Sequence, residues 1–155
     1  MLTPVKKQKP TRSRGSFAII AGRYNAKYVD SMVAAAEEEL QRAGVRKIRV
    51  VRVPGAFEIP AVAARLAAAK PSYSALICLG VILRGQTAHA QQIGDALSKA
   101  LADLQIQRAL PVIHEVLLLE NEAQAVARCL GTKHNRGAEA AQTALEMERV
   151  MASLD

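Results

Sequence analysis

The chain has 155 residues, a length that suits one domain with a core of its own. Half of the residues are hydrophobic but only 3% are aromatic and none is Trp, so the core must be aliphatic and aromatic platforms for nucleic-acid bases are not expected. The formal net charge is +7, and five positive charges fall in residues 1–16, which contain no acid. The rest of the chain balances 16 cations against 14 acids. We therefore expect no nucleic-acid partner.

The sequence shows no signal for export or membrane insertion. Its N-terminus lacks the apolar centre of a signal peptide, and no apolar run approaches the roughly 20 residues of a membrane span. We expect a cytoplasmic protein without a membrane partner. The two cysteines, Cys78 and Cys129, are too few for a disulfide framework, and the three histidines lack metal-ligand spacing. Free thiols and no metal site are expected.

Residues 1–16 contain two prolines and five cations, without a periodicity that could bury an apolar face. We interpret them as a basic N-terminal arm, disordered or extended on a neighbouring subunit. A single domain is then expected at residues 17–155. The alternative interpretation of the arm is that its charge only serves solubility.

The first half of the domain alternates strand and helix. FAIIAG, at residues 17–22, is a short apolar run typical of a strand buried on both faces. The helix that follows is stopped by Gly44, and in the next turn Pro54 and Gly55 reverse the chain before Pro60 opens a second helix. The expected elements are a strand at 17–22, a helix at about 27–42, a strand at 47–53 and a helix at about 60–69.

The second half repeats this alternation. An apolar strand ends in VILRGQTAHA, where Gly85 turns the chain and Thr87 is the candidate N-cap of a long amphipathic helix. Asn121, with Gln124 three residues later, indicates the start of a short helix. The expected elements are a strand at 75–83, a helix from Thr87 to about Leu104 with a buried stripe of Ile93, Ala96, Leu97, Ala100, Leu101 and Leu104, a strand at 109–118, a short helix from Asn121 to Arg128 or Cys129, and a last helix at about 138–154.

Four strand–helix alternations with a fifth helix predict an α/β domain, in which a four-stranded parallel sheet is flanked by helices on both faces. Ligands of such sheets bind outside the carboxyl ends of the strands. Tyr24, the PGAFE turn at 54–58, the RGQTAH turn at 84–89 and His114 are expected to gather there. In this aromatic-poor chain, Tyr24 is either a lid on the core or a stacking surface for a planar ligand.

The RGQTAH turn has the features of an anion site with a proton-transfer group beside it. A Gly-containing turn before a helix presents free backbone N–H groups and the positive end of the helix dipole. His89 follows on the first helical turn, and an imidazole with an ordinary pKa of about 6.5 suits proton transfer near neutrality. The pattern favours a catalytic centre for a phosphorylated substrate, although taken alone it also fits an ordinary turn with a surface histidine.

Five segments, in this order, resemble the 6,7-dimethyl-8-ribityllumazine synthase family of riboflavin biosynthesis. They are GRYN at Gly22, VPGAFEIP at Val53, GVILRGQTAH at Gly80, LPVIHEVL at Leu110 and ARCLGTKHNRGAEAA at Ala127. The resemblance extends from residue 17 to about 154, and the ordered set is far more specific than any single segment. It implies a three-layer, flavodoxin-like domain.

The resemblance also implies a transferase that condenses 5-amino-6-(D-ribitylamino)uracil with 3,4-dihydroxy-2-butanone 4-phosphate to lumazine, phosphate and water. The amine forms an imine with the butanone carbonyl, phosphate leaves, and the ring closes with loss of water. None of these steps is a redox reaction, so no cofactor or metal is expected. The alternatives are a homologue that binds flavin or lumazine without turnover, and a shell-forming homologue.

Residue by residue, the resemblance assigns proton transfer to His89. Binding of the ribitylaminouracil is assigned to Tyr24 by stacking, to Ala56, Phe57 and Glu58 along the ribityl chain, to backbone groups of Val81, Ile82 and Leu83, and to the ring of His114. Binding of the butanone phosphate is assigned to Gln86, Thr87 and Arg128. Asn25 and Arg136 are further candidates for the site, without an assigned role.

Some positions depart from the family pattern. His114 stands where relatives usually have an aromatic ring, Ala90 and Gln91 follow His89 in place of an aromatic residue and an acid, and Arg136 replaces the usual Lys. The resemblance further implies a homo-pentamer or a multiple of it, with an icosahedral capsid as one possible form. It implies active sites at subunit interfaces, with Phe57 and Glu58 on one side and His89 and Arg128 on the other.

Overall fold

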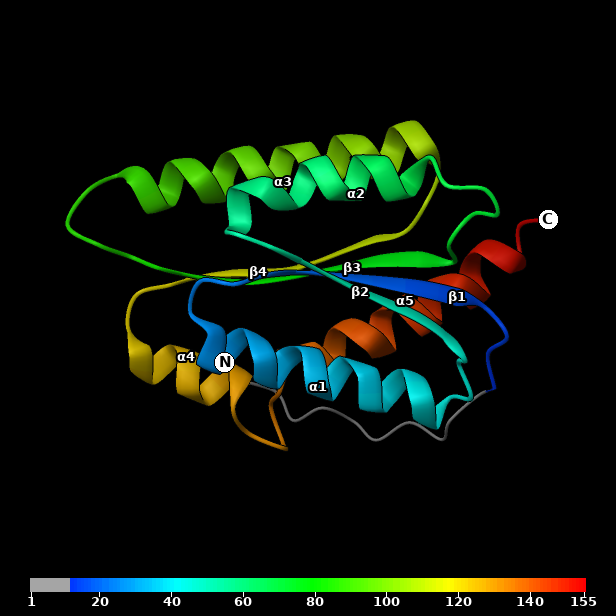
Figure 1. Ribbon diagram of the computed structural model, residues 1–155, viewed down its shortest axis with the longest axis horizontal. Helices are drawn as coiled ribbons and strands as arrows, with labels where there is room; N and C mark the ends of the chain where they lie inside the picture. Colours follow the sequence, from blue (N-terminus) through cyan, green and yellow to red (C-terminus); the bar gives the residue numbers. More distant parts are fainter. Residues whose placement is uncertain (1–11) are drawn as a thin grey trace.

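A four-stranded parallel sheet forms the centre of the computed structural model, which describes residues 12–155 (Figure 1). All strand pairings are parallel, and the strand order is β2-β1-β3-β4. The predicted α/β fold class is confirmed. The strands are β1 (Ser16–Gly22), β2 (Lys47–Val53), β3 (Ala75–Leu83) and β4 (Val112–Leu119).

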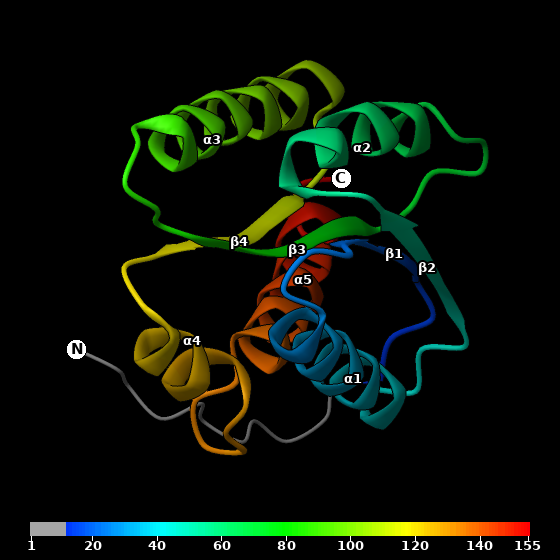
Figure 2. The same ribbon diagram turned by 60° about the vertical axis from the view of Figure 1, so that its left-hand side comes forward.

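Helices cover both faces of the sheet and complete the three predicted layers. α2 and α3 lie on one face, while α1, α4 and α5 lie on the other (Figure 2). None of the helices within residues 12–155 is both long and apolar enough to cross a membrane. The helices are α1 (Ala26–Arg42), the single turn η1 (Ala56–Glu58), α2 (Ile59–Ala67), α3 (His89–Arg108), α4 (Glu122–Cys129) and α5 (Arg136–Ala152).

The two helical layers explain why β1 is apolar at every position. Phe17, Ile19 and Ala21 are fully buried in the core beneath α1 and α5, whereas Ala18 and Ile20 are fully buried beneath α2 and α3. Consecutive side chains of a strand point to opposite faces, so a strand covered twice needs apolar residues throughout. Burial of each large aliphatic side chain contributes about 1.5–3 kcal/mol to folding. Packing on both faces therefore fixes the position of β1 and of the loop that follows it.

The helix after the RGQTAH turn differs from the prediction at its start, at its end, which is Arg108 rather than about Leu104, and in its buried stripe. α3 begins at His89 rather than Thr87, because the residues before it form a turn; the Thr87 hydroxyl accepts a hydrogen bond only from the amide of His89, at 3.3 Å. Ala96 was expected in the buried stripe but is exposed. The residues of α3 that are buried are Ala90, Leu97, Leu101 and Leu104.

Two further boundaries shift because of local backbone geometry. β4 begins at Val112 rather than Ala109, because Ala109 terminates α3 in a left-handed conformation with a φ of 48°. α5 begins two residues earlier than expected because Asn135 caps it. The buried side chain of Asn135 accepts from the amide of Gly137 and donates to the carbonyl of Cys129, both at 2.8 Å.

The chain is packed on its own domain from Ser13 onward. The amide of Ser13 donates to the carbonyl of Ala43 at 2.8 Å, and its hydroxyl donates to the Glu148 carboxylate at 2.6 Å. These bonds hold the start of β1 against the ends of α1 and α5. Residues 1–11, which make up most of the predicted arm, lie outside the described residues.

Close packing of α5 on α1 depends on the absence of a side chain at Gly137. A Cβ atom there would lie 1.9 Å from the carbonyl oxygen of Met32 in α1. We expect Gly137→Ala to destabilise the protein by about 2 kcal/mol or more, because backbone atoms cannot move aside as a flexible side chain can. Chemical unfolding at matched protein concentration measures this difference.

Gly131→Ala is the matched control for this prediction. A Cβ atom at Gly131 would meet no atom closer than 3.9 Å, and the backbone there does not have a positive φ. Its effect should stay within about 0.5 kcal/mol. Equal stability losses for both variants would contradict the role assigned to Gly137.

Candidate functional site

A pocket of about 780 Å³ opens at the carboxyl ends of β1, β2 and β3, the left edge of the sheet in Figure 1. This volume is that of a typical small-molecule site. The pocket lies where ligands of parallel α/β sheets bind. It is lined by Gly22, Tyr24, Asn25, Gly55, Ala56, Phe57, Glu58, Gly80, Val81, Ile82, Leu83, His89, Gln92, Ile93 and Ala96.

The loop after β1 is fixed to the end of β3 by Asn25. Asn25 adopts the left-handed conformation, with φ 57° and ψ 43°, and its side-chain amide donates to the carbonyl of Val81 at 2.8 Å. The amide of Tyr24 donates to the carbonyl of Pro54 at 3.3 Å, which links this loop to the turn after β2 as well. The loop after β1, the turn after β2 and the end of β3 are thereby held together at one edge of the sheet.

The PGAFE turn presents a carboxylate and an aromatic ring to the pocket. The amide of Gly55 donates to the Glu58 carboxylate at 2.9 Å, which orients that group. A Cβ atom at position 55 would lie 2.7 Å from the ring of Tyr24, so a larger residue here would displace that ring. Tyr24 and Phe57 are 69% and 60% exposed. Two of the few aromatic rings of this chain are thus held at the mouth of a pocket, where they can cover a planar or extended ligand.

The end of β3 offers backbone hydrogen-bonding groups to the pocket. Pairing of β3 with β1 stops at Leu79, opposite Ala21, whereas pairing with β4 continues to Leu83. Backbone N–H and C=O groups on the β1 side therefore extend past the end of the neighbouring strand. Backbone groups along this staggered edge can form hydrogen bonds with the donors and acceptors of a heterocycle, without any side chain.

The N-terminus of α3 brings His89 to the same pocket. Gln92, Ile93 and Ala96 line it too, and they follow His89 at the i+3, i+4 and i+7 positions of one helix face. Sequence reasoning missed these three as site residues, although the helical spacing from His89 was sufficient to find them. Ile93 and Ala96 were expected in the core, but at this end of the helix their side chains line the pocket.

The turn before α3 is held in place by Arg84. Its guanidinium donates to Glu120 at 2.9 Å and to the side-chain oxygen of Gln91 at 2.8 Å. Gln86 and Thr87 are exposed in this turn, next to the pocket in sequence but outside its lining. The helix N-terminus beside them attracts anions through its free amides and its dipole.

His114 does not join the other predicted site residues. It is the third residue of β4, opposite Cys78 in the middle of β3, and it does not line the pocket. Its Nδ1 accepts from the amide of Val116 at 3.1 Å, so Nε2 carries the proton and donates to the Ser98 hydroxyl at 2.8 Å. Partial burial lowers the pKa of His114, which favours this neutral form. The expectation that His114 lies at the carboxyl edge with Tyr24 was wrong, because His114 is near the amino-terminal end of β4.

Arg128 and Arg136 also lie outside the pocket of their own chain. Arg128 is half-buried in the last turn of α4, and Arg136 begins α5, so both belong to the layer opposite α3. Arg136 pairs with Glu139, and this partner raises the pKa of its guanidinium. It also faces Glu115, whose pKa is raised to about 7 by burial.

This geometry corrects the expected division of the shared site. Phe57, Glu58 and His89 all line one pocket in one chain, so His89 does not stand on the opposite side of an interface from Glu58. Arg128 is separated from them by the sheet. The Arg128 guanidinium therefore cannot reach the pocket of its own chain, and only the Arg128 of a second chain could contact a ligand there.

The pocket combines groups suited to acid–base chemistry on a polar organic substrate. It holds an oriented carboxylate, exposed aromatic rings, free backbone groups at the end of a strand, and an imidazole beside a helix N-terminus. Within residues 12–155 no three His, Cys, Asp or Glu residues cluster so as to hold a metal ion. Both cysteines are buried and unpaired, which confirms the expected free thiols.

Comparisons with known proteins agree with this geometry. Residues 14–152 match the family model described as 6,7-dimethyl-8-ribityllumazine synthase. A protein of that name from Stenotrophomonas maltophilia (strain R551-3) is 40% identical over 146 residues, covering 93% of this chain and 94% of its own. A protein of the same name from Xanthomonas euvesicatoria pv. vesicatoria (strain 85-10) is 41% identical over 145 residues and covers 92% of both chains. The chain therefore belongs to the 6,7-dimethyl-8-ribityllumazine synthase family.

Proposed function

We propose that the chain forms 6,7-dimethyl-8-ribityllumazine from 5-amino-6-(D-ribitylamino)uracil and 3,4-dihydroxy-2-butanone 4-phosphate, as a transferase of riboflavin biosynthesis. The observation that carries this proposal is the single pocket in which Glu58, the free end of β3 and His89 meet, in a chain about 40% identical to proteins with that name. A cytoplasmic location stays a prediction.

The pocket has a place for each part of the pyrimidine substrate. We assign the ring to the space beside Tyr24, where the protruding backbone of 81–83 faces its polar edge. The ribityl chain then extends toward Phe57 and Glu58, and the oriented carboxylate accepts hydrogen bonds from its hydroxyls. Ala56 lines the same wall and leaves room for the chain.

The second substrate belongs at the N-terminus of α3. Its phosphate is assigned to the turn with Gln86 and Thr87, where free amides and the helix dipole favour an anion. His89 lies between this turn and the pyrimidine position, so its imidazole can move protons as the imine forms and as phosphate leaves. Holding both substrates in one pocket makes their condensation effectively intramolecular.

We infer that a neighbouring subunit completes the phosphate site. Arg128 is suited to a phosphate but lies behind the sheet in its own chain, and Arg136 and His114 are likewise outside the pocket. A homo-pentamer or a multiple of it, including a capsid, would supply these groups across each interface. Exposed apolar side chains on the outer elements, Ile106 at 78% and Leu154 at 74%, fit such contacts.

Mixing both substrates with the pure protein and following lumazine absorbance tests the proposed reaction. We expect His89→Ala to slow turnover by about 100- to 10,000-fold, the usual contribution of a general acid–base group, while the pyrimidine still binds. Gln107→Ala, an exposed change at the far end of the same helix, is the control. An unimpaired rate in the His89 variant would assign proton transfer to another group.

Arg128→Ala should raise the KM for the butanone phosphate at least about tenfold and leave that for the pyrimidine almost unchanged. The reason is that a guanidinium forms charge-assisted bonds to phosphate worth about 1.5–3 kcal/mol, which correspond to tenfold or more. Steady-state kinetics with each substrate varied in turn measures both constants. Arg65→Ala removes an exposed cation of α2 and serves as the control. Equal changes in both constants would exclude a phosphate role.

Mixed oligomers test the shared site directly. Glu58→Gln and Arg128→Ala subunits, each impaired when tested alone at substrate concentrations near the KM of the unchanged protein, should regain activity after dissociation and joint reassembly, because some interfaces then combine an intact pocket with an intact Arg128. Glu58→Gln mixed with His89→Ala should show no such recovery, because both residues belong to the same pocket of one chain. Recovery in the second mixture, or none in the first despite verified mixing by mass spectrometry, would refute this division.

A further inference from the structure

A second hollow, of about 810 Å³, lies near the amino-terminal ends of β1 and β2, far from the pocket described above. Its polar lining contains five cations and no acid. The residues that line it are Arg12, Ser13, Arg14, Gly15, Arg42, Gly44, Arg46 and Lys47.

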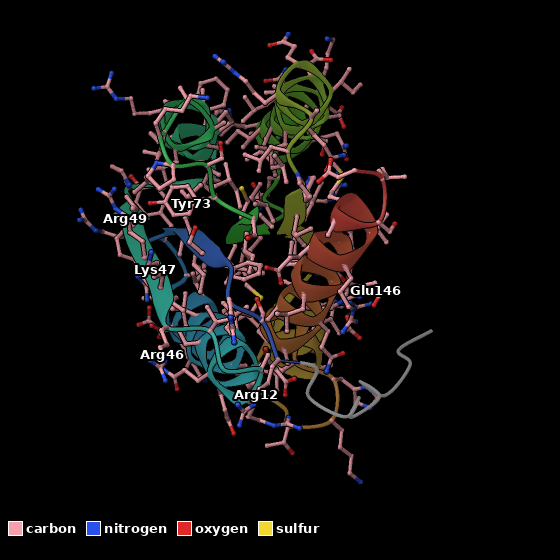
Figure 3. The ribbon with its side chains drawn as sticks, turned by 90° about the vertical axis from the view of Figure 1, so that its right-hand side faces the viewer. Arg12, Arg46, Lys47, Arg49, Tyr73 and Glu146 are labelled. Carbon is pink, nitrogen blue, oxygen red and sulfur yellow. The ribbon has the colours of Figure 1, made fainter. Side chains whose placement is uncertain are left out.

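The cations come from three separate segments. Arg12 and Arg14 precede β1, Arg42 ends α1, and Arg46 and Lys47 lead into β2. Figure 3 shows Arg46 and Lys47 along the edge of the molecule formed by β2, and Arg12 beyond the end of α1. The fold therefore brings together positive charges from separate segments, and the positive charge of the hollow does not come from the basic N-terminal sequence alone.

Most of these cations have no acidic partner. Arg42 forms an ion pair with Glu39. The other four cations, Arg12, Arg14, Arg46 and Lys47, form no ion pair with any acid among residues 12–155. All five of the cations that line the hollow are exposed at their ends. Like charges held this close repel one another, and a concave surface of one sign concentrates counter-ions.

Acids near the hollow are already engaged with other groups. Glu148 lies behind it and accepts hydrogen bonds from Ser13 and from the Ser74 hydroxyl at 3.3 Å. Glu39 accepts from Arg42 and from the side chain of Gln142. Neither carboxylate lines the hollow, and the five cations that line it outnumber these two acids.

We propose that this hollow binds an oligophosphate, meaning a chain of two or more linked phosphate groups. A guanidinium group can donate two parallel hydrogen bonds to phosphate oxygens, and four arginines and one lysine lining one hollow suit several adjacent phosphates better than a single one. A small ligand is favoured over a nucleic-acid strand because the cations surround a hollow, and none of the residues lining it is aromatic and able to stack a base.

The site is separate from the reaction. The hollow and the catalytic pocket share no residue and belong to opposite ends of the strands. Bound oligophosphate would therefore not compete with the butanone phosphate at His89. Changes to the hollow should leave lumazine formation intact, which makes that activity a check on folding.

The test is calorimetric binding of inorganic tripolyphosphate to the full-length chain. We expect saturable binding that weakens steeply with added salt. The variant Arg46→Gln/Lys47→Gln should weaken it at least about tenfold, as should Arg12→Gln/Arg14→Gln on the other wall, because each removes charge-assisted bonds. The control Arg65→Gln/Lys70→Gln removes the same charge from exposed positions outside the hollow and should change affinity by less than about threefold.

Three results would overturn the proposal. Equal losses in all three double variants would show a general effect of net charge. Inorganic phosphate binding as tightly as tripolyphosphate would exclude a site for linked phosphates. A single-stranded oligonucleotide binding where tripolyphosphate does not would identify a nucleic-acid surface instead.

Discussion

The pocket at the carboxyl edge of the sheet depends on the staggered pairing of three strands. β3 continues past the last residue that pairs with β1, but it stays paired with β4 on its other side up to Leu83. The protruding segment is therefore rigid although one of its edges is open. Loops from β1 and β2 close around this edge, and α3 begins just beyond it. Moving the register by a residue would invert the buried faces of the strand, so the double-sided core also fixes the pocket.

Much of this arrangement could be predicted from local sequence. The limits of β2 and β3 agree with those expected, because β3 is an apolar run between Ser74 and Arg84 and β2 is rich in β-branched residues and ends at Pro54. Asn121 caps α4 by accepting from the amide of Gln124 at 2.9 Å, as its spacing predicted. Tyr24, Phe57, Glu58 and His89 converge because strands in one parallel sheet end at the same edge.

The wrong predictions concern the position of His114 along its strand and the face of the sheet on which Arg128 lies. His114 was placed at the carboxyl edge because β4 was known to be a strand, but its position within the strand was not considered. Arg128 was grouped with His89, yet α4 and α3 cover opposite faces. Sequence order does not show which face of the sheet a helix covers, since consecutive helices can cross to either face. The division of a shared site between chains requires the three-dimensional arrangement.

The bond from Asn25 to the carbonyl of Val81 has a consequence for ligand affinity. Together with the bonds from the amides of Arg23 and Tyr24 to the carbonyls of Val53 and Pro54, it restricts the loop that carries Tyr24. A loop without these bonds would have to lose its conformational freedom when a ligand binds. The entropic cost of fixing each backbone residue, about 1–2 kcal/mol, is here already included in the free energy of folding. The ring of Tyr24 is therefore in position before any ligand binds, so binding beside it needs little rearrangement of this loop and more of the contact energy remains as affinity.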